Sequence, residues 1–137
     1  MHPLKTYIVE DSAVIRDNLI ATLEELVPVK VLGTAEDESS AVRWLRQPGN
    51  LADLLIVDIF LKQGSGLGVL RAAADVRRAH KTVVLSNYAT PDMRRRCLDL
   101  GADRVFDKSN EIEALILYCR RLATGETGDS AYATLGG

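Results

Sequence analysis

The stretch of sequence that decides the fold is DLLIVDIFL, residues 53–61. Its centre, Leu54–Val57, is apolar at every position, which is typical of a strand covered on both faces in a parallel sheet. The apolar run ends at Asp58, and glycines at positions 64, 66 and 68 follow. Such a turn leads into a helix, which we expect over residues 67–80. The stretch therefore predicts a strand, a turn and a helix, with a carboxylate placed where the strand stops.

Similar units lie on both sides of this stretch. Apolar, β-branched runs predict strands, and apolar residues spaced three or four apart predict helices. The expected strands are 6–9, 29–33, 54–57, 82–85 and 104–107, and the expected helices are 13–26, 37–47, 67–80, 91–100 and a last helix capped by Ser109 or Asn110. Five alternating units of this kind predict an α/β domain with a parallel sheet and helices on both of its faces.

Length and composition limit the class of protein. A chain of 137 residues fits one domain, which we expect at residues 1–124, and GETGDSAYATLGG at 125–137 predicts a disordered tail. The net charge of −2 argues against a nucleic-acid partner bound through bulk positive charge. The sequence has no run of about 18 apolar residues, so it predicts no membrane-spanning helix. Two cysteines are too few for a secreted disulfide framework, so we expect a reduced, cytoplasmic setting.

Polar residues stand at the carboxyl ends of four expected strands. Ligands of open α/β sheets bind outside these ends. Each residue taken alone has an ordinary structural explanation as a loop, turn or cap residue, but their joint order along the strands favours one shared crevice. The residues are Glu10 and Asp11 after the first strand, Asp58 after the third, Ser86 after the fourth and Lys108 after the fifth.

The residue types indicate the chemistry. Three neighbouring carboxylates repel one another unless a cation joins them, and clustered oxygens without imidazole or thiolate favour Mg²⁺ or Mn²⁺. Lys108 and Ser86 then suit phosphate oxygens, one as a charge and one as a hydrogen-bond donor. The pattern predicts phosphoryl transfer to a carboxylate nucleophile.

These residues resemble the receiver domain of two-component response regulators. The matching stretches are IVEDS (8–12), DLLIVDIFL (53–61) followed by Gly66 and Leu67, VVLSNYAT (83–90), GADRVFDKS (101–109) and the final helix. The resemblance runs from Lys5 to about Ala123. It implies a flavodoxin-like, doubly wound (βα)5 fold with strand order 2-1-3-4-5.

The resemblance also implies a role for each site residue. Asp58 resembles the phosphoacceptor, Ser86 the switch hydroxyl and Lys108 the lysine that pairs with the phosphoryl group. The implied metal ligands are Asp11 directly, Glu10 through water, Asp58 itself and the backbone carbonyl of Phe60. The implied donor is a phosphohistidine on a histidine kinase or a phosphotransfer protein.

The sequence departs from the usual receiver pattern at four positions. Lys62 stands where proline is common, and Ser109 replaces the proline that often follows the lysine. Asn87 stands where a small residue is usual, which predicts narrower access to Asp58. Val105 occupies the position of the aromatic switch residue, and Phe106 should point to the other face of the strand. The usual coupling between hydroxyl and aromatic is therefore in doubt.

The departures at positions 87 and 105 keep one alternative open, a pseudo-receiver that binds proteins without phosphorylation. A haloacid-dehalogenase-type phosphatase also uses an aspartate nucleophile, but it needs a second aspartate where this chain has Phe60. A flavin-binding flavodoxin needs a phosphate-cradling loop after the first strand, which is missing. We therefore expect a signalling receiver that is not an enzyme toward other substrates.

Partner surfaces are less clearly marked in the sequence. Arg94, Arg95 and Arg96 span most of a helical turn, and we expect mainly a solvated surface there. The alternative is a charged contact, and the last two helices with the fifth strand are the expected surface for a downstream protein or a homodimer. We expect no nucleic-acid partner for this chain.

Overall fold

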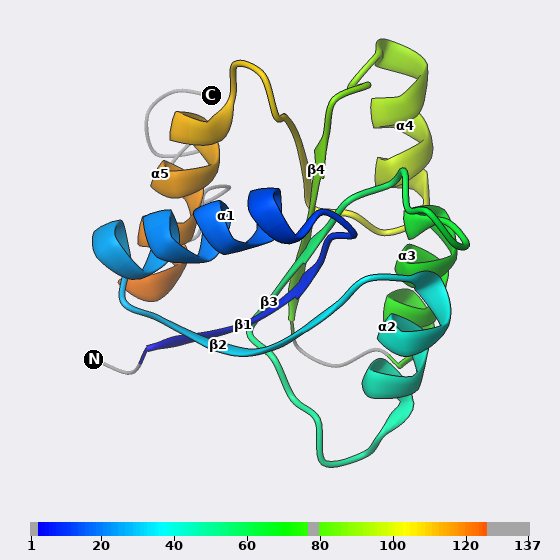
Figure 1. Ribbon diagram of the computed structural model, residues 1–137, viewed down its shortest axis with the longest axis horizontal. Coiled ribbons are helices and arrows are strands. Elements are labelled where there is room, and N and C mark those ends of the chain that lie inside the picture. Colours follow the sequence, from blue (N-terminus) through cyan, green and yellow to red (C-terminus); the bar gives the residue numbers. More distant parts are fainter. Residues whose placement is uncertain (1–2, 77–79, 126–137) are drawn as a thin grey trace.

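The computed structural model describes residues 3–76 and 80–125. Strands and helices alternate along the described chain, as Figure 1 shows. The strands are β1 (Leu4–Val9), β2 (Val29–Ala35), β3 (Leu54–Val57), β4 (Lys81–Ser86) and β5 (Arg104–Asp107). The helices are α1 (Ala13–Leu26), α2 (Glu38–Arg46), α3 (Gly66–Val76), α4 (Pro91–Asp99) and α5 (Ile112–Ala123).

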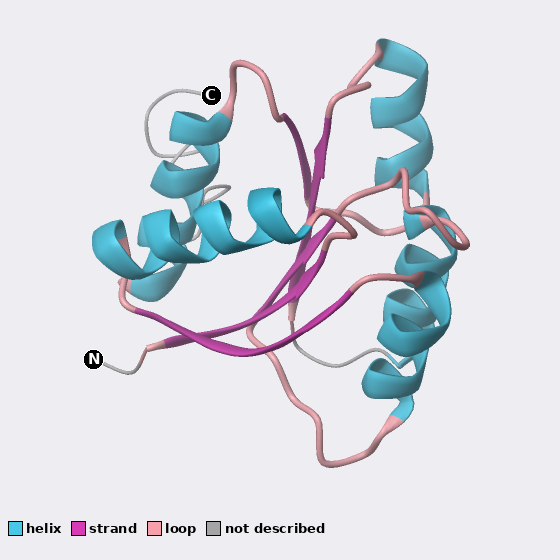
Figure 2. Ribbon diagram, in the orientation of Figure 1, coloured by secondary structure: helices cyan, strands magenta, loops and turns pink. Residues whose placement is uncertain are grey.

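The strands form one parallel sheet in the order β2-β1-β3-β4-β5. Helices α1 and α5 lie on one face, and α2, α3 and α4 lie on the other (Figures 1 and 2). The predicted flavodoxin-like α/β fold and strand order are therefore confirmed. Because all strands run the same way, their carboxyl ends meet at one edge of the sheet.

Side chains of each strand alternate between two apolar clusters, one on each face of the sheet. In β3, Leu55 and Val57 join the cluster under α2, α3 and α4, whereas Leu54 and Ile56 join the one under α1 and α5. In β5, Val105 and Phe106 also divide between the two faces. Phe106 therefore points away from the face that position 105 occupies, as the alternation predicts.

Helix ends carry residues of the types that favour caps, except at the start of α5. The Ser12 hydroxyl accepts a hydrogen bond from the Ile15 amide, and Gly101 has a φ of 104° after α4. The predicted cap of α5 by Ser109 or Asn110 is wrong. Glu111 precedes α5 and makes no side-chain cap bond, because its carboxylate binds other groups.

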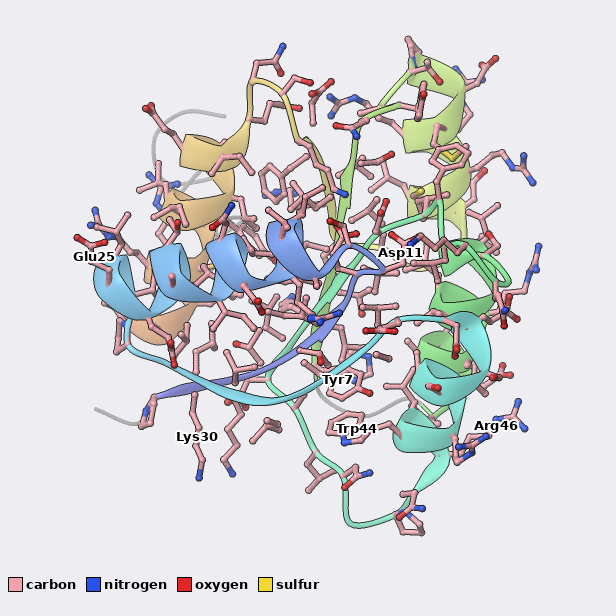
Figure 3. All side chains as sticks on the ribbon, in the orientation of Figure 1. Tyr7, Asp11, Glu25, Lys30, Trp44 and Arg46 are labelled. Carbon is pink, nitrogen blue, oxygen red and sulfur yellow. The ribbon has the colours of Figure 1, made fainter. Side chains whose placement is uncertain are left out.

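One aromatic stack and the two cysteines add to these apolar clusters. Trp44 of α2 stacks on Tyr7 of β1, with ring centroids 3.9 Å apart (Figure 3). Cys97 and Cys119 are buried, and burial raises the pKa of the Cys119 thiol to about 12.

In the part of the chain that the structure describes, no helix has the length and apolar character needed to cross a membrane. The predicted tail lies outside the described residues from position 126 onward.

Candidate functional site

The carboxyl edge of the sheet brings the predicted acidic residues and the lysine together. Glu10 and Asp11 follow β1, Asp58 follows β3 and Lys108 follows β5. Backbone hydrogen bonds fix these positions, because the Asp58 amide donates to the Val9 carbonyl at 2.9 Å and the Lys108 amide donates to the Ser86 carbonyl at 2.9 Å. Asp11 lies where β1 turns into α1 (Figure 3). The sheet itself therefore sets the separation of these groups.

Lys108 joins two of the carboxylates. Its ammonium group lies 2.5 Å from Glu10 Oε1 and 3.0 Å from Asp58 Oδ2. The side chains of Lys108, Glu10 and Asp58 are 10%, 4% and 8% exposed. These charges are therefore largely removed from water, where an ion pair is screened far less than on the surface.

The environment shifts the titration of two members of this cluster. Burial raises the pKa of Glu10, and the nearby Asp58 charge adds to the rise, while hydrogen bonds from Lys108 and the Ser12 amide oppose it. For Lys108, burial lowers the pKa, but the hydrogen bonds and charges of Glu10 and Asp58 outweigh burial and raise it overall. The lysine is therefore a permanent cation in this site, whereas Glu10 is a carboxylate that ionises reluctantly.

The acidic cluster has the form of a cation site. Carboxylate oxygens of Glu10, Asp11 and Asp58 all lie within 4.8 Å of one another. Both oxygens of Glu10 already accept hydrogen bonds, one from Lys108 and one from the Ser12 amide at 3.1 Å. Asp11 accepts the Lys62 amide through Oδ2 alone, at 2.8 Å. Hard oxygen ligands suit Mg²⁺, and Asp11 is half-buried at the opening of the cluster.

A cavity of about 160 Å³ opens onto these groups. Phe60 and Tyr88 stand at its mouth, with their rings edge to face and the centroids 5.0 Å apart. Both residues are exposed, at 49% for Phe60 and 62% for Tyr88. Asn87 lines the same cavity. An aromatic pair and an amide therefore share the cavity with Asp58, and the narrower access predicted from Asn87 stays a prediction.

Ser86 occupies a different position from the other site residues. It is completely buried, and its hydroxyl accepts a hydrogen bond from the Tyr88 amide at 3.1 Å. The residues that line the cavity do not include it. The structure therefore brings Glu10, Asp11, Asp58, Phe60 and Lys108 together around the cavity, and it places Ser86 beneath the loop that forms one wall.

The loop after Asp58 is anchored by a residue that sequence reasoning missed. The Glu38 carboxylate, at the start of α2, accepts the Ser65 amide at 2.8 Å, and Ser65 pairs with Phe60 in an isolated antiparallel bridge. A Cβ at Gly68 would lie 2.2 Å from Glu38 Oε2, so only glycine leaves room for this carboxylate. In the sequence, the glycines around position 66 indicate a close contact at this loop, but they do not identify Glu38 as the residue that contacts it.

Arg94 is only partly solvated, so the expectation of a mainly solvated surface does not describe this residue. Its guanidinium donates to the Ala89 carbonyl, the Val105 carbonyl and the Glu111 carboxylate. Arg95 and Arg96 are exposed, as expected. The difference arises because only Arg94 lies on the side of α4 that faces β5 and the loop before α5.

Comparison with known families agrees with this geometry. A model of the response regulator receiver domain matches residues 6–120. A match over most of the chain shows that this protein belongs to the response regulator receiver domain family. The family is that of two-component signalling, and its members interact with histidine kinases or phosphotransfer proteins.

Individual relatives are distant. The chain is 29% identical over 117 residues to protein-glutamate methylesterase/protein-glutamine glutaminase 5 of Myxococcus xanthus, covering 85% of this chain and 33% of that protein. The first curated relatives are much longer, and this chain spans between about a quarter and a half of their length.

Solved structures show the same fold at low identity. The isolated receiver domain of RcsB from Salmonella enterica serovar Typhimurium, with the phosphomimetic BeF3−, gives a TM-score of 0.78 at 22% identity, covering 92% of each chain. The response regulator domain of Thermotoga maritima CheB gives 0.75 at 19% identity, covering 90% of this chain and 98% of that chain.

Proposed function

We propose that this receiver domain accepts a phosphoryl group on Asp58 in the presence of Mg²⁺ and signals through the resulting change in its surface. The observation that carries the proposal is the buried cluster in which Lys108 contacts both Glu10 and Asp58 beside the half-buried Asp11. A purely structural ion pair does not require a third carboxylate or an open cavity. Glu10, Asp11, Asp58 and Phe60 are the proposed metal-binding residues, and Mn²⁺ is an acceptable substitute for Mg²⁺.

The chemical step is displacement at phosphorus. A carboxylate oxygen of Asp58 attacks the phosphorus of a phosphohistidine, an O–P bond forms and the N–P bond breaks. The electron pair of the broken bond stays on the imidazole of the donor, which takes up a proton. Lys108 contacts Asp58 Oδ2, so its ammonium is already beside the acceptor and can bind an oxygen of the arriving phosphoryl group.

The metal, when bound, supplies positive charge to the phosphoryl oxygens. Asp11 is the proposed direct ligand because only its Oδ2 accepts one of the hydrogen bonds described above, from the Lys62 amide. Both oxygens of Glu10 accept hydrogen bonds, from Lys108 and from the Ser12 amide. The carbonyl of Phe60 lies in the loop that Glu38 anchors through Ser65. The Ser86 hydroxyl accepts the Tyr88 amide, so its own proton is left to donate to a phosphoryl oxygen. To act as the switch hydroxyl, Ser86 has to reach the cavity, whose lining does not include it.

The proposed partners follow from this function. A histidine kinase or a phosphotransfer protein donates the phosphoryl group, and a downstream protein recognises the phosphorylated form. The proposed recognition surface is α4, β5 and α5, which is also the proposed surface of a homodimer. The chain acts on its own phosphorylation state and not on another substrate, and nucleic acid is not a proposed ligand.

The function is tested by phosphorylation with a small donor. The protein is incubated with acetyl phosphate or phosphoramidate, with and without Mg²⁺, and its intact mass is measured. We expect one phosphoryl adduct that requires Mg²⁺ and is absent in Asp58→Asn. A wild-type protein that is folded, binds Mg²⁺ and forms no adduct with either donor supports the phosphorylation-independent alternative.

A further inference from the structure

Arg94 of α4 has no role in the proposed metal binding or phosphoryl transfer. Its guanidinium makes three hydrogen bonds to three separate segments. Nε donates to the Ala89 carbonyl at 2.9 Å, Nη1 to the Val105 carbonyl at 2.9 Å, and Nη2 to Glu111 Oε1 at 2.6 Å. We call this set of contacts the Arg94 clasp.

Both loops that carry proposed phosphoryl-binding residues meet in the clasp. Ala89 belongs to the loop that follows Ser86, the last residue of β4, and Glu111 belongs to the loop that begins at Lys108. Glu111 reaches further, because Oε1 also accepts the Asp107 amide at 2.9 Å and its own amide donates to the Asp107 carbonyl. Asp107 is directly bonded in sequence to Lys108, so the clasp ends one residue from the proposed phosphoryl-binding lysine.

The clasp is more than a surface ion pair. Arg94 and Glu111 are each about one-third exposed, and such a pair alone contributes little to stability. Two backbone carbonyls from different segments occupy the rest of the guanidinium fork, and a planar fork fixes the geometry of all three partners at once. The hydrogen bond from Arg94, assisted by its charge, also lowers the pKa of Glu111, so this carboxylate remains ionised.

The Arg94 clasp lies against the face of β5 on which Val105 replaces the usual aromatic residue. Position 105 carries valine, and the Val105 carbonyl is one of the clasp acceptors. No aromatic side chain from β5 lies on that face of the sheet, because Phe106 packs in the cluster under α1 and α5. From α4, the Arg94 guanidinium hydrogen-bonds to β5 and to both site loops at once.

We propose that Arg94 is a positioning residue that couples the phosphoryl pocket to α4. A group bound between Ser86 and Lys108 draws on both loops, and the clasp ties each of them to the first turn and a half of α4. A change in either loop therefore changes the position of α4. This proposal rests on the proposed function, since it assumes that the pocket binds a phosphoryl group.

The test uses beryllofluoride with Mg²⁺ as a phosphoryl analogue and follows backbone amide chemical shifts by NMR. The Ser12 and Lys62 amides report on the pocket, and the Cys97 and Leu98 amides report on α4. The variants are Arg94→Lys, which keeps the charge but loses the fork, and Glu111→Gln, which keeps the shape but loses the charge. Arg95→Lys, a neighbouring exposed arginine on α4, is the matched control.

In the wild type and in Arg95→Lys, we expect both sets of amides to shift. In Arg94→Lys, the pocket amides still shift, while the α4 amides lose most of their response and the affinity for beryllofluoride falls by about five-fold. Glu111→Gln should show a smaller loss in the same direction. The pocket amides also show that each variant is folded, so a structural role alone does not reproduce this pattern.

Two results contradict the account in different ways. An unchanged α4 response in Arg94→Lys, with normal pocket shifts, overturns the coupling role and leaves the proposed function intact. An absence of pocket shifts in the wild type at saturating Mg²⁺ and beryllofluoride overturns the proposed function, and the coupling role falls with it.

Discussion

The interior of β3 and its carboxyl end differ sharply although they are adjacent in sequence. Leu54–Val57 is almost completely buried among apolar side chains on both faces of the sheet. The next residue, Asp58, is also buried, but it is surrounded by Glu10, Asp11 and Lys108. Burial stabilises the first region through the hydrophobic effect and imposes a desolvation cost on the second.

The difference shows that the two regions are built for different purposes. Three carboxylates face one ammonium group in the cluster, so it carries an excess of negative charge that only a further cation or protonation relieves. The apolar interior needs no such partner. The sheet therefore supplies the stability with which the fold keeps a repulsive site in place.

The largest expected change in the free energy of unfolding comes from Lys108→Ala, which changes the buried charged cluster and leaves the apolar interior of β3 as it is. The change leaves Glu10 and Asp58 buried without their cation, so we expect the free energy of unfolding to fall by about 3 kcal/mol at pH 7 without Mg²⁺. Urea unfolding measures the change. Lys62→Ala, which removes an exposed lysine near the same cavity, is the control and should change stability by about 0.5 kcal/mol at most. Equal losses in the two variants contradict the argument from burial.

Mg²⁺ should relieve the repulsion and stabilise the fold by mass action. At about one hundred times the dissociation constant, we expect the free energy of unfolding to rise by about 2.7 kcal/mol. Asp11→Asn should remove most of this gain and Glu10→Gln less of it, because direct ligation outweighs a contact through water. Urea unfolding at a series of Mg²⁺ concentrations measures both. Equal losses in the two variants contradict the proposed difference between these ligands.

The mouth of the cavity should set the lifetime of the phosphorylated form. Phe60 and Tyr88 line the same cavity as Asp58, and neither side chain carries a carboxylate or amide that could orient an attacking water. We expect the two rings to shield Asp58. We expect dephosphorylation to be slowed by about ten- to a hundred-fold, or about 1.4–2.7 kcal/mol of barrier, relative to Phe60→Asn combined with Tyr88→Glu. First-order loss of phosphate in Mg²⁺ measures the rate. A double variant that decays no faster than the wild type removes shielding as the explanation.

The smallest expected effect is a pH dependence that belongs to Glu10. Burial raises its pKa in the folded state above the ordinary value of 4.5. The folded protein therefore holds this proton more tightly, and the associated stability is present below about pH 4.5 and is lost as the pH rises through the higher folded value. Without Mg²⁺, the wild type should lose stability relative to Glu10→Gln as the pH rises above 4.5. Urea unfolding across this range checks the sign, and a difference that is constant with pH contradicts it.

The sequence was sufficient for the fold and for the members of the acidic cluster. Apolar, β-branched runs mark the strands, and parallel strands must bring Glu10, Asp58 and Lys108 to one edge. The sequence was not sufficient for contacts that depend on how helices pack on the sheet. Arg94 looks the same as Arg95 in a helical pattern, and only the placement of α4 against β5 separates them.

The same limit applies to the loop ends. Ser109 and Asn110 are good cap residues by type, yet Glu111 is the residue before α5. Its carboxylate accepts hydrogen bonds from Arg94 and from the Asp107 amide. A local rule fails there because a tertiary contact competes with the cap. The role of Ser86 as a switch hydroxyl stays a prediction, since this residue is completely buried and does not line the cavity.

The most direct test of the central proposal identifies the residue that carries the phosphoryl group. After incubation with acetyl phosphate and Mg²⁺, sodium borohydride reduces an aspartyl phosphate to homoserine, and peptide mass spectrometry locates the changed residue. The account predicts homoserine at position 58 alone, strongly reduced when Mg²⁺ is removed by chelation or when Asp11 is changed to asparagine. Homoserine at another aspartate, or equal labelling of Asp58 with and without the metal, would contradict it.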